Sequence, residues 1–187
     1  MILAGDVGGT KCNLALFSEK GGTLTPVFKQ RFASKEFAQF ERIVKEFSRQ
    51  AADHLGKDSI VAAGFGIAGP VINGTVRATN LPWIVDTKSL VKELDVPHVV
   101  LLNDLGATGH SIEHLPAQDF CVLNPGSPEP GGTRALIAAG TGLGQSFLVW
   151  DGGRYRVVPS EGGHSDFAPH TEQQIELRAS CAAAILR

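Results

Sequence analysis

The sequence predicts an α/β protein, built either as one large domain or as parts of two. Short apolar runs bounded by Gly, Asn or Asp are typical of buried strands, and one long segment has apolar residues every three or four positions, as in an amphipathic helix. The chain has 187 residues, of which 43% are hydrophobic and 19% charged. This is sufficient apolar material for a packed core.

The first part of the chain predicts three strands and then a helix. "MILAG" is a short buried strand, "CNLALF" alternates toward a second, and a glycine pair marks the turn to a third strand that reaches Phe32. From Ser34 the apolar period changes to three or four residues. We expect an amphipathic helix there, with Ser34 as its N-cap and Gly56 at its end.

The middle of the chain alternates strands and helices. "SIVAAGFGIAG" predicts a buried strand, and "VINGTVRA" carries an Asn-Gly hairpin turn between two short strands. Asp86 is placed to cap a helix that runs to Leu94. "HVVLLND" predicts another buried strand, which ends in an Asn-Asp pair.

The last third predicts strands first and a helix at the end. "AQDFCVL" is expected as a strand, followed by a surface loop, "NPGSPEPGG". "RALIAAG", "QSFLVW" and "RYRVVP" are expected as three further strands, with a glycine pair turning the second into the third. Thr171 and Gln174 form a capping box, so a helix is expected from Thr171 to Arg187.

Two segments of the chain share one order of strands and turns. This order helps to interpret the stretch "GDVGGTKC", whose glycines and lysine are similar to those of a phosphate-binding loop. In "AGDVGGTKCNLALFSEKGGTLTPV" and in "AGTGLGQSFLVWDGGRYRVVP" an apolar strand, a glycine-rich turn, a second strand, a double-glycine turn and a third strand follow one another. A P-loop or a Rossmann turn needs a helix after the glycines, and none is expected here. We therefore expect two hairpin tips that approach phosphate through main-chain N–H groups from opposite sides.

Asp6 follows the first strand beside these glycines. A carboxylate at a phosphate-holding turn is suited to Mg²⁺, which binds through water between the carboxylate and phosphate oxygens. The alternative is that Asp6 only caps the turn, as Asp often does.

Asn103 and Asp104 end a predicted buried strand, where ligands bind in parallel α/β sheets. A carboxylate there can accept a proton from a substrate hydroxyl that attacks phosphorus, and the amide of Asn103 suits sugar hydroxyls. The alternative interpretation is an ordinary helix cap.

The loop "PSEGGHSDFAP" groups Glu161, His164 and Asp166 around two glycines. A carboxylate and an imidazole in one loop can hydrogen-bond neighbouring sugar hydroxyls. A metal site is the alternative, but no further Cys/His cluster supports it.

Composition excludes several classes of protein. The net charge is −2 and no basic block is present, which argues against a nucleic-acid surface. The longest nearly apolar run is too short to cross a bilayer, and no leader pattern precedes the early Gly and Asp. Three widely spaced cysteines without a metal-binding pattern favour free thiols. We expect a soluble cytoplasmic protein that binds neither nucleic acid nor membrane.

The motifs "GDVGGT", "GIAGPV", "ATNLPW", "LLNDLGA", "AAGTGLG" and "EGGHSDFAP", in this order, resemble the bacterial ATP-dependent glucokinases. These belong to the superfamily of sugar kinases, Hsp70 and actin. The resemblance runs from Met1 to about Phe167. It implies an actin-like ATPase (ribonuclease H-like) fold, in which two α/β domains close on glucose. It also explains the internal duplication.

The resemblance assigns roles to individual residues. Asp104 matches the catalytic base that activates the glucose 6-hydroxyl. The sugar-binding residues match Asn103, Glu161 and His164, and Asn80 lies in the loop near the sugar. ATP is expected as the phosphoryl donor with Mg²⁺, and no metal ligand is assigned from the protein. The two phosphate motifs match Gly5, Asp6, Val7, Gly8, Gly9 and Thr10, and Gly140, Thr141 and Gly142.

The resemblance also implies that the chain is an N-terminal portion. We expect a small domain over residues 1–115, with the first phosphate loop and Asp104, and the beginning of a large domain over 116–187, with the second phosphate loop and the sugar-binding loop. Only one cysteine follows the Glu-Gly-Gly-His loop, which disfavours the zinc-binding repressor relatives. For the complete protein we expect glucokinase activity, which transfers the γ-phosphoryl group of ATP to the 6-hydroxyl of glucose, and for this truncated portion weak activity or none. A homodimer is also expected. The alternatives are a non-catalytic sugar-sensing or interaction protein and a kinase of another hexose.

Overall fold

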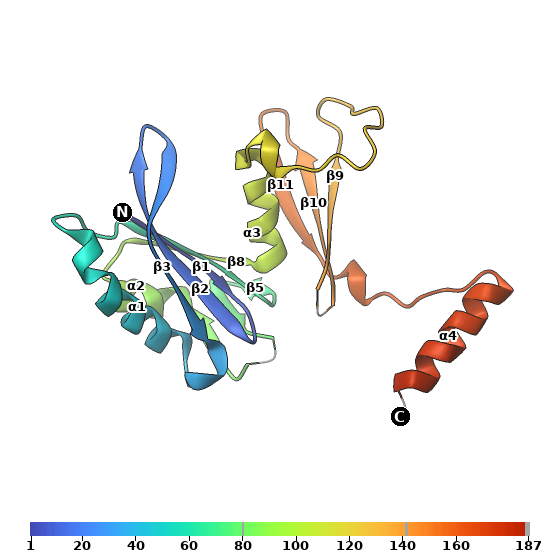
Figure 1. The fold of residues 1–187 in the computed structure, drawn as a ribbon, viewed down its shortest axis with the longest axis horizontal. Coiled ribbons are helices and arrows are strands. Elements are labelled where there is room, and N and C mark those ends of the chain that lie inside the picture. The colour runs from blue at the N-terminus through green and yellow to red at the C-terminus, as the bar shows by residue number, and fades with distance from the viewer. Residues whose placement is uncertain (80, 141, 186–187) are drawn as a thin grey trace.

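A computed structural model describes residues 1–79, 81–140 and 142–185 of the chain (Figure 1). The strands are β1 (Ile2–Val7), β2 (Lys11–Lys20), β3 (Thr23–Ala33), β4 (Ala62–Ile67), β5 (Val71–Ile72), β6 (Thr75–Arg77), β7 (Ile84–Asp86), β8 (His98–Asn103), β9 (Arg134–Ala139), β10 (Leu143–Trp150) and β11 (Tyr155–Ser160). The α-helices are α1 (Phe40–Leu55), α2 (Thr87–Leu94), α3 (Asp104–Ser111) and α4 (Glu172–Ile185). Short 3₁₀ helices are η1 (Ser34–Glu36), η2 (Ile112–His114), η3 (Ala117–Asp119) and η4 (Gly162–His164).

The first sheet has the strand order β3-β2-β1-β4-β8. Strands β1, β2 and β3 form an antiparallel meander, whereas β4 and β8 run parallel to β1. Because parallel strands end at the same edge of a sheet, the carboxyl ends of β1, β4 and β8 lie side by side. The predicted α/β architecture is confirmed in this half of the chain.

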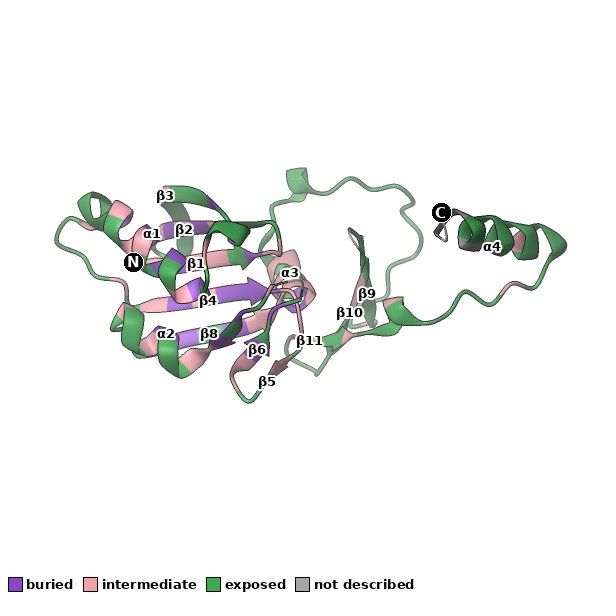
Figure 2. Ribbon diagram, turned by 90° about the horizontal axis from the view of Figure 1, so that it is seen from below, coloured by how far each residue is buried: buried purple, intermediate pink, exposed green. Residues whose placement is uncertain are grey.

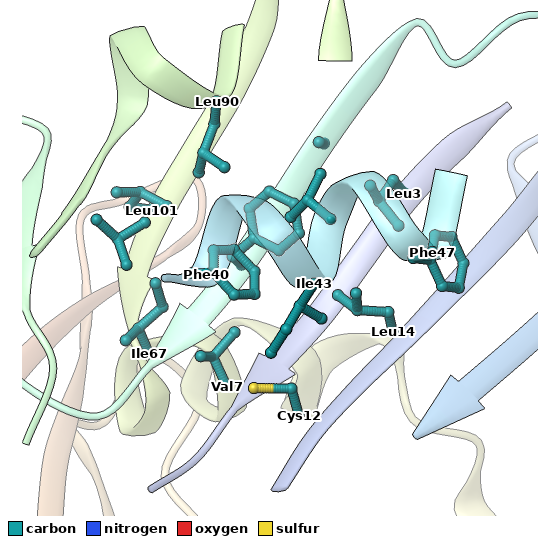
Figure 3. Close-up of a cluster of buried hydrophobic side chains, with 14 of the residues drawn as sticks. Leu3, Val7, Cys12, Leu14, Phe40, Ile43, Phe47, Ile67, Leu90 and Leu101 are labelled. Carbon is teal, nitrogen blue, oxygen red and sulfur yellow. The ribbon is translucent and has the colours of Figure 1, made fainter. Parts of the chain in front are cut away.

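The core lies between this sheet and helices α1 and α2, which cover the same face. Five buried residues of α1 recur at helical spacing and form its apolar stripe: Phe40, Ile43, Val44, Phe47 and Ala51. The ring of Phe40 meets that of Phe65 on β4 edge to face, at 5.1 Å between centroids. Figure 3 shows these side chains converging with Leu3, Leu14 and Leu90. The alternating apolar residues of the strands and the apolar residues at helical spacing on α1 therefore pack into one core.

The start of α1 differs from the prediction. Helix α1 begins at Phe40 with Gln39 as its N-cap residue, and Ser34 instead opens the separate 3₁₀ turn η1. The Ser34 hydroxyl donates to the carbonyl oxygen of Gly8, a residue far away in the sequence, and is unavailable as a cap. The predicted end of the helix is correct, since Gly56 follows Leu55 with a positive φ of 59°.

A small antiparallel sheet, β5-β6-β7, follows β4. Asn73 and Gly74 turn β5 into β6 with φ angles of 51° and 75°, as the left-handed turn predicted from the Asn-Gly pair requires. Asp86 caps α2 as predicted, because its carboxylate accepts from the N–H groups of Lys88 and Ser89. The hydroxyl of Thr75 also donates to Asp86, and this bond is the main reason that the pKa of the carboxyl is lowered.

Helix α3 contacts both the first sheet and the second (Figure 1). The contacts are close because each of them has a glycine on one side, Gly66 on β4 and Gly109 on α3 itself. A Cβ on Gly66 of β4 would lie 3.0 Å from the Cβ of Ala107, and a Cβ on Gly109 would lie 2.7 Å from a methyl of Val157 on β11. Side chains larger than hydrogen at these positions would therefore push α3 away from one sheet or the other.

The second sheet has the order β11-β10-β9, and both strand pairs are antiparallel. It repeats the meander of β1, β2 and β3, so the predicted duplication of strand, glycine turn and strand is confirmed. Its inner face carries Ser146 and Leu148, both buried against α3, whereas most of the sheet is exposed (Figure 2). The predicted division of the chain after residue 115 stays a prediction.

The segment expected as a strand over "AQDFCVL" is not one. Residues 117–119 form η3, and the chain from Phe120 to Gly132 is irregular and mostly exposed. Val122 and Leu123 are 72% and 93% exposed, because no neighbouring strand is present to pair with them in the described chain. Apolar alternation alone predicted a strand here, but a strand needs a partner.

Helix α4 lies apart from both sheets at the end of an extended segment (Figures 1 and 2). Its capping box is formed as predicted, since the hydroxyl of Thr171 accepts from the N–H of Gln174 and the Gln174 side chain accepts from the N–H of Thr171. Its predicted last two residues lie outside the described residues. Across the described ranges, none of the helices has the length and apolar character needed to span a bilayer.

Candidate functional site

The predicted site residues of the first half lie along one edge of the first sheet. Asp6 on β1 pairs with Gly66 on β4, and Ile67 pairs with Asn103 at the end of β8. A Cβ on Gly66 would lie 3.7 Å from the Cα of Asp104. Asp6 and Asp104 are therefore both neighbours of Gly66, one on the adjacent strand and the other at the start of α3.

The first glycine loop joins β1 directly to β2, as predicted. The N–H of Gly8 donates to the carbonyl of Lys11 at 3.0 Å, which closes the turn over Gly9 and Thr10. Gly5 and Val7 lie inside β1 on its core-facing side, where a Cβ on Gly5 would overlap Leu14 and Phe65. Any contact of these two residues with phosphate must come from their main chain.

The carboxylate of Asp6 is exposed and accepts a hydrogen bond from the Asn13 side chain at 3.1 Å. Asn13 in turn accepts from Arg31 at 3.0 Å, so a row of three side chains crosses β1, β2 and β3. The carboxylate bonds across the sheet to β2. The second carboxylate oxygen stays available for a ligand, with no bond to it found within residues 1–79, 81–140 and 142–185.

The second glycine loop joins β9 to β10. The N–H of Gly140 donates to the carbonyl of Gly142 at 2.8 Å, which makes a tight hairpin tip, and a Cβ on either glycine would meet no atom closer than 4.0 Å. The tip is therefore open to a ligand. Thr141, the third residue predicted for this loop, lies outside the described residues.

Asn103 is the N-cap of α3. Its side-chain oxygen accepts from the N–H groups of Leu105 and Gly106, and its amide nitrogen donates to the carbonyl of Gly69 at 3.2 Å. The predicted helix-cap alternative is thus correct for Asn103. One amide hydrogen remains for a ligand, so capping and sugar binding are compatible.

Asp104 is the first residue of α3 and is half-buried. One carboxylate oxygen accepts from the N–H of Leu105 at 2.9 Å. The other oxygen has no hydrogen-bond partner in the part of the chain that the structure describes. A carboxylate with one oxygen held and the other available is the arrangement that a general base needs.

Glu161 and His164 lie at the two ends of η4, and their side chains are 3.5 Å apart. The glycines between them are required by packing. A Cβ on Gly163 would lie on the carbonyl oxygen of Leu143, and a Cβ on Gly162 would lie 2.6 Å from the side-chain oxygen of Gln145. This contact with β10 holds the loop against the second sheet.

A cleft of about 420 Å³ brings residues of the two halves together. Asn103 and Gly106 line it from the β8–α3 junction, and Pro159 and Glu161 line it from β11 and the loop that follows. Asp104 and His164 do not line the cleft. Asp104 directly follows Asn103 in the chain, and His164 is three residues after Glu161. Asn80, the other predicted sugar contact, lies outside the described residues.

His110 also lines this cleft, and the sequence interpretation missed it. Its position seven residues after Asn103, about two helical turns along α3, was the available signal, because residues at this spacing lie on the same side of a helix.

No group of three or more His, Cys, Asp and Glu side chains arranged to hold a metal ion occurs within the described ranges. A magnesium ion bound with a nucleotide needs only one or two protein carboxylates, because phosphate oxygens and waters supply the other ligands. Asp6, whose second carboxylate oxygen accepts no hydrogen bond within the described ranges, fits that requirement.

Comparison with known proteins gives one consistent result. The family model described as Glucokinase matches residues 3–186. A glucokinase of Nostoc punctiforme is 42% identical over 179 residues, which cover 95% of this chain and 51% of that protein. A glucokinase of Synechocystis is 43% identical over 182 residues, covering 94% of this chain and 51% of that protein. The chain spans about half the length of the curated relatives it matches.

Solved structures agree on the fold. A glucokinase from an Antarctic psychrotroph superposes with a TM-score of 0.77 at 24% identity, over 95% of this chain and 55% of that one. A glucokinase of Balamuthia mandrillaris in complex with glucose gives a TM-score of 0.73 at 22% identity, over 95% and 53%. These likenesses confirm the predicted actin-like ATPase fold.

Proposed function

Because this chain belongs to the glucokinase family, we propose that it acts in the transfer of the γ-phosphoryl group of ATP to the 6-hydroxyl of glucose. The observation that carries the proposal is the cleft in which Asn103 and Glu161 meet beside Asp104. Residues more than fifty positions apart there bring together amide and carboxylate groups suited to sugar hydroxyls, and Asp104 directly follows Asn103 in the chain.

Asp104 is proposed as the general base. Its free carboxylate oxygen accepts the proton of the 6-hydroxyl as that oxygen attacks the γ-phosphorus, and the bond from phosphorus to the β,γ-bridging oxygen breaks. The N–H of Leu105 holds the other oxygen of Asp104 at 2.9 Å, so the carboxylate is oriented before the sugar binds. Orientation of this kind lowers the barrier without rearrangement during the reaction.

Glu161, His164, Asn103 and Asn80 are proposed as sugar contacts. The carboxylate of Glu161 and the imidazole of His164 are 3.5 Å apart, so they can hydrogen-bond two neighbouring hydroxyls of one sugar ring. The remaining amide hydrogen of Asn103 can donate to a sugar oxygen from the opposite wall of the cleft.

The two glycine tips are proposed to hold the phosphates of ATP. The first comprises Gly5, Asp6, Val7, Gly8, Gly9 and Thr10, and the second Gly140, Thr141 and Gly142. Strands β1 and β9 both run toward the lower side of the view, on either side of α3 (Figure 1). Mg²⁺, when bound with ATP, neutralises negative charge on the transferring phosphoryl group, and Asp6 is the carboxylate placed to hold it through water.

The first test is a coupled assay of ADP release by the 187-residue chain with glucose, ATP and Mg²⁺. Asp104→Ala should reduce glucose-dependent release by about 10²-fold or more, because a general base contributes roughly that much. Glucose binding, measured by calorimetry, should persist in this variant. The matched control is Asp53→Ala, which removes an exposed carboxylate from α1, far from the cleft.

Other outcomes of this assay separate the alternatives. Full turnover by Asp104→Ala would refute the assignment of the base. Glucose binding without turnover by the wild-type chain would favour the sugar-sensing alternative. Faster turnover with mannose or an N-acetyl-hexosamine than with glucose would identify that sugar as the preferred substrate.

We also propose a homodimer and a cytoplasmic location. The exposed apolar side chains of the second sheet support self-association, and the free thiols of Cys12, Cys121 and Cys181 are compatible with a reducing compartment. Both proposals can be examined separately, by sedimentation and by cell fractionation.

A further inference from the structure

Ser34 is fully buried directly beneath the first glycine loop, although it is a polar residue in an apolar core. It follows β3, whose last residue, Ala33, pairs with Lys11 at the start of β2. Pairing of β3 with β2 therefore brings Ser34 next to the loop between β1 and β2, although the two are far apart in the sequence. Sequence periodicity gave no indication of this contact.

Ser34 holds the loop at both of its ends. Its hydroxyl donates to the carbonyl oxygen of Gly8 at 2.7 Å, and its main-chain N–H donates to the carbonyl oxygen of Thr10 at 3.1 Å. Within the loop, the N–H of Gly8 donates to the carbonyl of Lys11. Three hydrogen bonds thus fix a turn of three residues.

The direction of the loop's N–H groups follows from these bonds. In a trans peptide the C=O and the N–H point in opposite directions, so a carbonyl of Gly8 held inward directs the N–H of Gly9 outward. An outward main-chain N–H is the group by which a glycine turn binds an anion.

A buried thiol completes the arrangement. The Sγ of Cys12 lies 3.3 Å from the Oγ of Ser34. The single hydroxyl hydrogen of Ser34 is used on Gly8, so the thiol of Cys12 is the donor in this contact. Burial raises the pKa of the Cys12 thiol, in agreement with a thiol that keeps its proton. Cys12 projects into the core beside Val7 (Figure 3).

We infer that Ser34 is a positioning residue for the first phosphate loop, which it holds so that the N–H of Gly9 faces the polyphosphate of the nucleotide. This inference rests on the proposed function, which assigns the loop to phosphate. Because the side chain of Ser34 is fully buried, it does not reach a ligand bound at the exposed side of the loop. Its effect is on the orientation of the loop.

The test uses the 187-residue chain labelled with ¹⁵N-glycine, titrated with MgATP and, separately, with tripolyphosphate and Mg²⁺. In the wild type the amide signal of Gly9 should shift on titration. In Ser34→Ala that shift should be reduced, and the dissociation constant for tripolyphosphate should rise by about three- to tenfold, which corresponds to one lost hydrogen bond. Ser34→Thr, which keeps the hydroxyl, should restore the affinity.

A control separates positioning from general loss of stability. Val44→Ala removes methyl groups from the buried stripe of α1 without touching the loop. It should lower the melting temperature and leave the tripolyphosphate affinity unchanged. If Ser34→Ala does not fold, Ser34→Cys takes its place, because a thiol of similar size is a weaker donor.

Two failures can be distinguished. Wild-type affinity and an unchanged Gly9 shift in Ser34→Ala would overturn the inference about Ser34 alone. Absence of any shift at Gly9 in the wild type, with either probe, would overturn the phosphate role of the loop and the inference with it.

Discussion

At the scale of single residues, the structure assigns different tasks to side chains that look similar in the sequence. Asn103 and Asp104 are adjacent, yet Asn103 caps α3 and Asp104 keeps one carboxylate oxygen available. Ser34 and Thr171 were both predicted as helix caps, yet only Thr171 makes a capping bond. In each case the role of the side chain depends on which hydrogen-bonding group lies within its reach in the folded chain.

The three cysteines illustrate the same point and can be tested directly. Cys12 is buried with a raised pKa, while Cys121 and Cys181 are exposed. Because the thiolate is the reactive form, we expect two thiols per chain to react quickly with a disulfide reagent at mildly alkaline pH and the third to react only in denaturant. Mass spectrometry of the labelled peptides checks which thiol is protected. Rapid labelling of Cys12 in the native protein would contradict its burial.

At the scale of elements, α3 connects the two sheets and begins with the proposed base. Its distance from each sheet depends on glycines, since Gly66 faces Ala107 on one side and Gly109 faces Val157 on the other. The N-terminal end of α3 is therefore held relative to both halves of the cleft. A change in this packing should affect stability and the site together.

Gly109→Ala tests this packing. Alanine is a better helix former than glycine, but its Cβ would lie 2.7 Å from a methyl of Val157, whose branched side chain has little freedom to move. We expect a net loss of about 1–3 kcal/mol in the free energy of unfolding, measured by denaturant titration. The control is Gly64→Ala on β4, where a Cβ meets no atom within 4 Å. Equal stability of the two variants would show that the contact is not restrictive.

At the scale of the whole molecule, burial is divided unevenly. The first sheet is packed against α1 and α2, whereas most of the second sheet is exposed (Figure 2). The outer face of the second sheet carries exposed apolar side chains. By strand register, these side chains share one face: Ile137, Leu143, Phe147, Val149 and Val158. An exposed apolar face of this kind favours association with another surface.

The corresponding prediction concerns self-association. We expect the chain to sediment with a mass that increases with concentration, and Phe147→Glu to shift the distribution toward monomer, because it places a charge in the outer face. Ile72→Glu is the matched control, since Ile72 is also exposed, at 65%, but lies on the small sheet. A single monomer species at all concentrations would contradict both this prediction and the proposed homodimer.

Features that depend on neighbouring residues could be predicted from the amino-acid sequence. The turn at Asn73 and Gly74, the cap at Asp86 and the capping box before α4 were all predicted, because main-chain dihedrals and short-range hydrogen bonds decide them. The two glycine hairpins and the α/β order followed from apolar periodicity in the same way. The motifs of the site were recognised from their order along the chain.

Features that depend on residues far apart in the chain became visible only in the folded structure. The bond from Ser34 to Gly8 spans 26 positions, the cleft joins Asn103 to Glu161, and His110 enters that cleft through the packing of α3. The segment after Pro116 has the alternation of a strand but remains irregular, since a strand is stabilised by a partner and not by its own sequence. Local periodicity carries no information about which distant groups meet.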